Sequence, residues 1–127
     1  MICCNPDYVV LRGDDRELCA GALALRYEEI GGEVYYHGKP HAPIYAESLK
    51  RLGLSDPARV LGVGDALRTD VAGATAAGMD SVLITSTGIM AKDMGIAPFE
   101  APAPAMLARM CAAEGHYPTA AIAAFRW

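Results

Sequence analysis

Basic residues, aromatic rings and long apolar runs are all scarce in this chain of 127 residues. Eleven Lys and Arg stand against fifteen Asp and Glu, a net charge of −4, so the basic surface that nucleic acid requires is not expected. No apolar run reaches the ~18 residues of a membrane span, and the first residues lack the pattern of a secretory signal. We therefore expect a cytoplasmic protein with no nucleic-acid and no membrane partner.

Cysteine is limited to four residues, Cys3, Cys4, Cys19 and Cys111. Their spacing gives neither a CxxC pair nor a metal-finger pattern, so reduced and mostly buried thiols are expected rather than a disulfide or a zinc site. The chain is 53% hydrophobic and 20% charged, which argues against disorder. Its length indicates one domain with one core.

Apolar stretches of strand length alternate with stretches of helical period. Strands are predicted at residues 1–4, 8–11, 34–37, 59–63 and 81–85, and helices at 18–30, 45–52, 69–77 and 106–113. Residues 12–16 read as a polar loop, and 120–127 as an apolar end whose Phe125 and Trp127 pack on the core. This alternation predicts an α/β fold, a parallel sheet flanked by helices, in which ligands bind beyond the carboxyl ends of the strands.

Two carboxylates stand where the strand at 59–63 ends. Asp65 follows Gly64 directly, and Asp70 comes five residues later in the first turn of the next helix. Two such oxygen donors suit Mg²⁺, which keeps several waters and takes few protein ligands. The alternative is that Asp65 or Asp70 only caps the helix. The residues alone leave the two interpretations about equal.

A lysine and a turn follow two other predicted strands. Gly38 lets the chain leave its strand and Pro40 stiffens the exit, so Lys39 is placed to neutralise a phosphate. The alternative is an ordinary exposed lysine. Asn5 and Asp7 form an Asn-Pro-Asp turn after the first apolar residues, which by itself indicates only a turn with Asx chemistry.

Taken in order, these three motifs resemble the haloacid dehalogenase (HAD) superfamily of phosphatases, and most closely its class IIA branch. The similarity runs from residue 1 to about residue 90 and includes the strings at 5–7, 38–45 and 64–70. It implies a three-layer, Rossmann-like sheet that is incomplete here. Residues 1–33 are then expected to be the carboxyl-terminal remnant of a C2-type cap, and 34–127 the second half of the HAD-like core.

The resemblance also implies roles for individual residues. Lys39 matches the lysine that contacts the phosphoryl group, and Asp65 matches the aspartate that ligates Mg²⁺. Asp70 matches the second acidic residue of that motif, so Lys39 and Asp70 are expected to be catalytic. Asn5 and Asp7 match the end of the cap and, with Lys39, are expected to bind substrate. The implied reaction is Mg²⁺-dependent hydrolysis of a small phosphomonoester (a sugar phosphate, a nucleotide or pyridoxal phosphate) through an aspartyl-phosphate.

One motif of that family is missing. The reaction needs an aspartate nucleophile in a DxDG string, and the 127 residues contain none. The chain is therefore predicted to be inactive alone, as the carboxyl-terminal portion of such a phosphatase. Two alternatives stay open: a non-catalytic module that binds phosphate and Mg²⁺, and a structural partner subunit. A half sheet with an open edge tends to pair with another chain, so a homo-oligomer through that edge is also expected.

Overall fold

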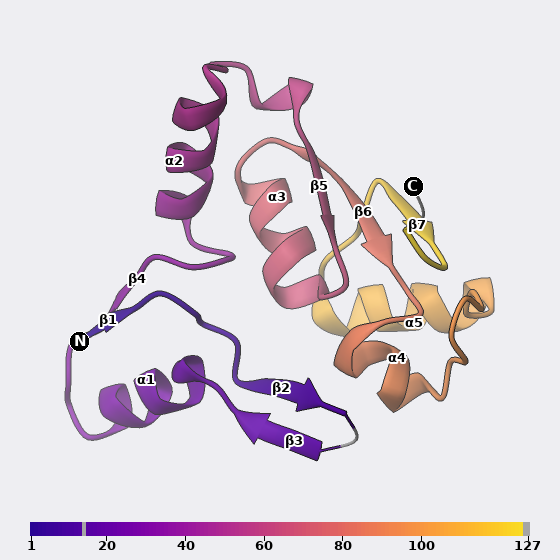
Figure 1. Ribbon diagram of the computed structural model, residues 1–127, viewed down its shortest axis with the longest axis horizontal. Helices are drawn as coiled ribbons and strands as arrows, with labels where there is room; N and C mark the ends of the chain where they lie inside the picture. The colour runs from indigo at the N-terminus through magenta and orange to yellow at the C-terminus, as the bar shows by residue number, and fades with distance from the viewer. Residues whose placement is uncertain (14, 126–127) are drawn as a thin grey trace.

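The computed structural model describes residues 1–13 and 15–125 (Figure 1). Its strands are β1 (Ile2–Cys3), β2 (Val9–Arg12), β3 (Asp15–Leu18), β4 (Tyr35–Tyr36), β5 (Leu61–Gly64), β6 (Asp80–Ile84) and β7 (Ala120–Ile122). Its α-helices are α1 (Ala20–Glu29), α2 (Ala42–Leu52), α3 (Ala72–Ala76), α4 (Gly88–Met94) and α5 (Pro104–Glu114). A 3₁₀ turn, η1 (Pro57–Arg59), precedes β5, and a π-helical turn, η2 (Leu67–Val71), leads into α3.

The main sheet has the order β5-β6-β7, and both of its pairings are parallel. Helices α3 and α5 lie beside it in Figure 1, and the predicted α/β fold with a parallel sheet flanked by helices is confirmed. Within the described ranges, β5 pairs with β6 only, so its other edge is open. Its alternate residues Leu61 and Val63 are 53% and 44% exposed.

The core lies between η2, β6 and α5. Leu67, Val71, Leu83 and Cys111 form one buried cluster, on which Met90, Leu107 and Met110 pack. Leu83 is fully buried because it lies in the central strand of the sheet. This cluster fixes the turn that follows β5, the turn that carries the predicted site.

The amino-terminal part lies beside the main sheet (Figure 1). There β1 pairs with β4 in parallel, while β2 and β3 form an antiparallel hairpin. The predicted loop at 12–16 and the helix start at residue 18 were therefore wrong. Gly13 turns the chain with a φ of +60°, and the helix begins at Ala20. All of β3 is exposed, so its sequence lacks the alternation that marks a half-buried strand.

The other elements depart from the predicted boundaries by a few residues. Pro57 starts η1, so β5 begins at Leu61 rather than at residue 59. The predicted helix at 69–77 is divided into η2 and α3, and α4 had not been predicted. Gly53 ends α2 in the left-handed conformation, with a φ of +66°, as a glycine at that position predicts.

All four cysteines are free, but only Cys3 and Cys111 are buried, and Cys4 is exposed against expectation. Cys4 follows the two-residue strand β1, which ends at Cys3. Phe125 is 49% exposed, so the expected packing on the core is at most partial, and Trp127 lies outside the described residues. None of the described helices has the length and apolar character to cross a membrane.

Candidate functional site

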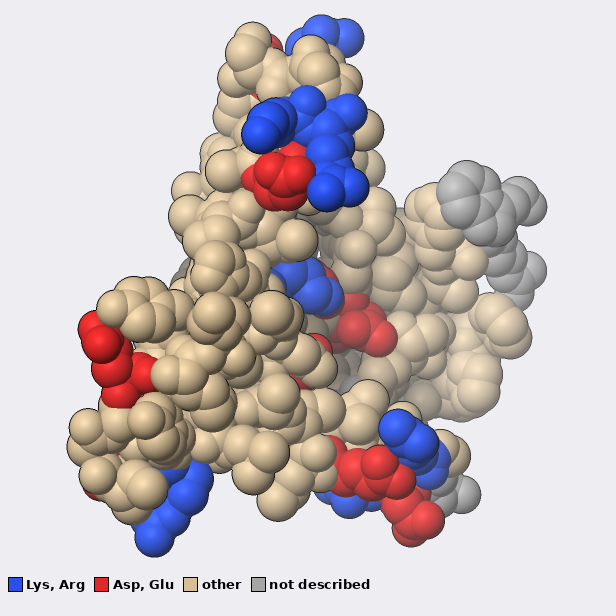
Figure 2. Space-filling view, turned by 60° about the vertical axis from the view of Figure 1, so that its left-hand side comes forward, with Lys and Arg blue, Asp and Glu red and all other residues tan. Residues whose placement is uncertain are grey.

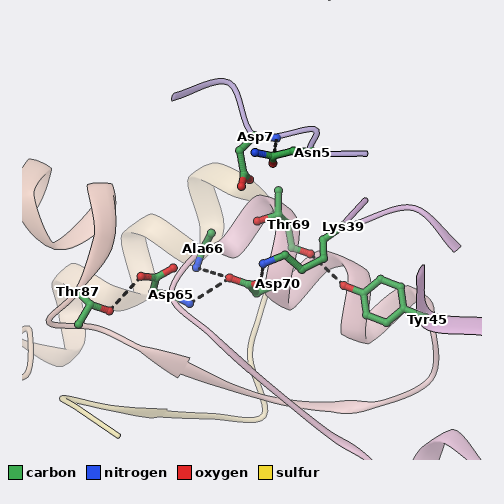
Figure 3. Close-up of polar contacts among 9 residues, drawn as sticks. All are labelled: Asn5, Asp7, Lys39, Tyr45, Asp65, Ala66, Thr69, Asp70 and Thr87. Carbon is green, nitrogen blue, oxygen red and sulfur yellow. Dashed lines mark hydrogen bonds and ion pairs between the residues drawn. The ribbon is translucent and has the colours of Figure 1, made fainter. Parts of the chain in front are cut away.

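Lys39 reaches the site from the segment after β4. A Cβ on Gly38 would lie 2.3 Å from the carbonyl oxygen of Cys4, so only glycine lets this segment pass so close to the chain after β1. The Lys39 ammonium donates to Oδ1 of Asp70, as Figure 3 shows. The residue is therefore held in an ion pair, although its side chain is 48% exposed.

Asp70 is held more firmly than any other charged group of the site. Its Oδ2 accepts the backbone N–H groups of Asp65 and Ala66, both at 3.1 Å, and its side chain is 11% exposed. A Cβ on Gly64 would lie 2.1 Å from the Asp70 carboxyl carbon, so a glycine must end β5. Asp70 thus reaches back to the start of its own helical turn, as a capping-box carboxylate does. The capping interpretation therefore applies to Asp70, whatever further role it has.

Asp65 lies at the tip of β5 and is held at one oxygen only. Its Oδ2 accepts the hydroxyl of Thr87, at 3.1 Å, from the loop between β6 and α4. Gly88 follows with a φ of +72°, and a Cβ there would lie 2.6 Å from the same oxygen. For Oδ1 no partner is found within the described part of the chain. Oδ1 of Asp65 is therefore left to a ligand.

Tyr45 braces the turn from the side of α2. Its phenol donates to the carbonyl oxygen of Thr69 at 3.3 Å, and its ring occupies the space that a Cβ on Gly73 would need. Burial, and then the negative charge of Asp70, raise the pKa of the Tyr45 phenol. The hydroxyl of Thr69 is buried, and it has no hydrogen-bond partner among the residues that the structure describes.

The charges of the site favour a protonated Lys39. Burial lowers the pKa of the Lys39 amine, but the hydrogen bond and charge of Asp70, with a contribution from Asp7, outweigh it. The pKa of Lys39 is therefore raised above its usual value. Because Asp70 already neutralises much of this ammonium, an incoming anion would share it with a carboxylate.

The two cap-side residues predicted to bind substrate are placed differently. The side-chain oxygen of Asn5 accepts the N–H of Asp7 at 3.2 Å, which is the Asx turn predicted for this segment. Asp7 lines the same groove as Lys39, whereas Asn5 does not. Figure 3 shows both on the segment that passes over the π-helical turn. The structure therefore brings Asp7, but not Asn5, to the wall of the site.

A groove of about 720 Å³ contains Lys39, Asp65 and Asp70. One wall is the segment 6–11 and the other is formed by η2, α4 and α5. Figure 2 shows one face of the molecule with a hollow near its centre, where basic and acidic side chains lie next to each other. No continuous basic surface surrounds them on this face. This volume is typical of sites for small molecules.

The donor set fits Mg²⁺ only in part. Among residues 1–13 and 15–125, no three His, Cys, Asp or Glu side chains are close enough together to hold a metal ion. Asp70 is occupied by Lys39 and two amides, so Asp65 is the carboxylate in position. A Mg²⁺ ion accepts one or two carboxylates with several waters, so Asp65 suits one corner of such a site.

Three residues of the site had not been identified as site residues from the sequence: Tyr45, Thr87 and Arg68. Thr87 had been interpreted as part of an ordinary loop, although its position after a strand, like that of Lys39 and Asp65, was a usable signal. Tyr45 was known only as part of a family string. Arg68 lies within the Asp65–Asp70 motif but carried no separate signal.

Lys39 after β4, Asp65 at the tip of β5 and Asp70 in the turn that follows all line one groove of an α/β fold. The HAD-hydrolase-like family matches residues 36–113, a stretch that holds all three side chains. The chain therefore belongs to the HAD-like hydrolases.

Solved structures agree with this assignment. A haloacid dehalogenase-like hydrolase from Brucella suis is 38% identical over 98% of this chain, with a TM-score of 0.72. A p-nitrophenyl phosphatase from Archaeoglobus fulgidus is 27% identical over 95%, with a TM-score of 0.69. A thermostable NPPase from Geobacillus stearothermophilus, at 23% identity over 99% and a TM-score of 0.65, supports the fold alone.

The chain spans less than half of these proteins, namely 44%, 42% and 44% of their respective lengths. The comparison with curated proteins gave no significant match.

Proposed function

We propose that this chain is the carboxyl-terminal portion of a Mg²⁺-dependent phosphatase that hydrolyses a small phosphomonoester, with residues 1–33 as the end of its cap. The observation that supports this most is the grouping of Lys39, Asp65 and Asp70 in one groove of a chain that belongs to the HAD-like hydrolases. Phosphatases among the similar structures support the same reaction class.

Each residue has a role in the proposal. Lys39 binds the phosphoryl oxygens through its ammonium, and Asp70 holds that ammonium in place while fixing the amides at the tip of β5. Asp65 offers its free oxygen to Mg²⁺, which when bound would neutralise charge on the phosphoryl group. Asp7 lines the cap side of the groove and favours the charged form of Lys39, whereas Asn5 holds the turn that carries Asp7.

The proposed reaction passes through an aspartyl-phosphate. A carboxylate oxygen attacks phosphorus, the ester bond breaks, and the alcohol leaves with a proton from a general acid. Water then hydrolyses the acyl phosphate and releases inorganic phosphate. Lys39 stabilises negative charge in both steps, and Asp65 would contribute by holding the Mg²⁺ ion, but neither is the attacking aspartate. Because the sequence has no DxDG string, we expect the chain alone not to turn over.

The test is binding rather than turnover. Inorganic phosphate is titrated into the ¹⁵N-labelled chain with and without Mg²⁺, and amide shifts around residues 39 and 65 are followed. Lys39→Gln is expected to weaken binding about tenfold, the effect of losing a charge-assisted contact, whereas Lys50→Gln on α2 leaves it unchanged. Asp65→Asn is expected to abolish the increase in phosphate affinity that Mg²⁺ causes. Equal binding by wild type and Lys39→Gln would refute the assigned phosphate site.

A second candidate, a structural partner subunit, rests on the open edge of β5. Leu61 and Val63 are about half exposed there, and an unpaired strand edge is a template for another chain. In this candidate a second copy, or another polypeptide, adds a strand beside β5. Light scattering at assay concentration separates the two: a monomer that binds phosphate supports the phosphatase portion and excludes a homo-oligomer.

A further inference from the structure

Three cationic side chains line the groove, and their partners differ. Lys39 is paired with Asp70, and Arg16 of β3 is paired with Asp93 of α4. Arg68 lies instead over the ring of Tyr8, 4.6 Å from the ring centroid. No carboxylate within residues 1–13 and 15–125 forms an ion pair with it. The Arg68 charge is therefore available to an anion that enters the groove.

Arg68 and Asp70 point in different directions. They are two residues apart on the π-helical turn η2, and residues at that separation do not share a helix face. Asp70 turns toward Lys39 and the tip of β5, whereas Arg68 turns toward Tyr8 on the opposite wall. The free positive charge thus lies at a different place in the groove from the Lys39 ammonium.

Tyr8 determines how the guanidinium can be used. A guanidinium stacked on an aromatic face is restrained in orientation, while the N–H groups in its plane remain free to donate. Those donors match the two oxygens of a carboxylate or a phosphate. The side chain of Arg68 is exposed on the surface of η2, so no burial opposes such a contact.

We propose that Arg68 binds a second anionic group of the ligand, a carboxylate or a further phosphate, while Lys39 receives the phosphoryl group. This inference rests on the proposed phosphate site. It identifies the substrate class as a phosphomonoester that carries a second negative charge. Tyr8 is a positioning residue for Arg68, and the groove, at about 720 Å³, has room for such a molecule.

The test compares two ligands that differ in one group. Glycerol 3-phosphate and 3-phosphoglycerate share the phosphoryl group, but only the second has a carboxylate. Their dissociation constants for the 127-residue chain are measured by amide shifts with Mg²⁺ present. We expect 3-phosphoglycerate to bind about fivefold more tightly, which is the upper range for an exposed ion pair. Arg68→Gln is expected to remove this preference, so that the two ligands bind equally.

Matched variants test whether the preference for 3-phosphoglycerate comes from Arg68 itself or from the net charge of the protein. Arg59→Gln in η1 loses the same charge outside the groove and is expected to keep the full preference. Tyr8→Leu is expected to reduce the preference while Tyr8→Phe keeps it, because only the ring face is needed. Circular dichroism confirms that each variant is folded.

The outcomes separate this inference from the proposed function. If both ligands bind wild type equally, or if Arg68→Gln weakens both by the same factor, the second anion site is refuted and the phosphate site stands. If neither ligand binds, the phosphate site itself is refuted, and the inference with it.

Discussion

The two ends of the site are built differently, although both belong to the same turn after β5. At the Asp70 end, the carboxylate has three donors, Lys39 and two backbone amides, and a glycine makes room for it. At the Asp65 end, a single hydroxyl from Thr87 holds one oxygen and leaves the other free. We call the Asp70 end the closed end, because both of its carboxylate oxygens are bonded, and this end stabilises the fold of the turn. We call the Asp65 end the open end, because one of its carboxylate oxygens is left for a ligand.

The largest loss of stability is expected from removing the Asp70 carboxylate at the closed end. Asp70→Ala leaves two amides and the half-buried ammonium of Lys39 without their acceptor, so the free energy of unfolding should fall by about 3 kcal/mol. Urea unfolding with an unchanged m-value measures this. Asp65→Ala is the matched variant at the open end and should change stability by less than about 0.5 kcal/mol. Equal losses would remove the distinction between the two ends.

A smaller loss is expected from Gly64→Ala. The new Cβ would lie 2.1 Å from the Asp70 carboxyl carbon, so the carboxylate must shift, at a cost of about 2 kcal/mol. In an Asp70→Ala background the same substitution should cost much less, and a double-mutant cycle measures this coupling. Additive losses in the cycle would show that Gly64 is needed for another reason.

The next largest loss of stability is expected from removing the hydrogen bond that Tyr45 of α2 donates to the turn. Tyr45→Phe removes the phenol that donates to the Thr69 carbonyl, and we expect a loss of about 1 kcal/mol in thermal or urea unfolding. Tyr35→Phe removes an exposed hydroxyl that bonds to Glu33 and serves as the control, with no measurable loss expected. A Tyr45→Phe protein as stable as wild type would show that the ring alone braces the turn.

The smallest expected effect is a pH dependence. The pKa of Lys39 is raised in the folded state, so its contribution to stability is complete below its usual value of 10.5 and is lost as pH rises through the folded value. Because the Lys39 side chain is 48% exposed, screening should keep this below about 1 kcal/mol. The urea midpoint, followed from about pH 9 upward, should therefore fall more in wild type than in Lys39→Gln. Parallel curves would contradict the assigned ion pair.

Sequence reasoning identified two site residues that follow strands, but it missed a third and also a residue that approaches from elsewhere. Lys39 and Asp65 were identified because each follows a predicted strand, and ligands of parallel sheets bind beyond the carboxyl ends of the strands. In the structure β4 and β5 belong to different sheets, so a shared sheet edge does not account for their meeting. Thr87 obeys the same rule but was not assigned to the site. Tyr45 reaches the turn through packing of α2 on α3, which no local pattern encodes.

The same contrast holds for the fold. The buried strand β6 and the glycine that ends α2 have local signals, and both were predicted. The exposed strand β3 has no alternation and was missed. The π-helical turn η2 depends on Asp70 bonding back to two amides, an interaction between side chain and backbone that periodicity cannot reveal. The functional roles of Asn5, Asp7, Lys39, Asp65 and Asp70 stay predictions.

Under the proposed function, the chain holds the charge-stabilising part of a phosphatase site without its nucleophile. The most direct measurement is Mg²⁺-dependent hydrolysis of para-nitrophenyl phosphate by the purified chain, with Asp65→Asn alongside. We expect no turnover by either protein above the rate without enzyme. Turnover by wild type that is lost in Asp65→Asn would contradict it, because a nucleophile would then act from within these 127 residues.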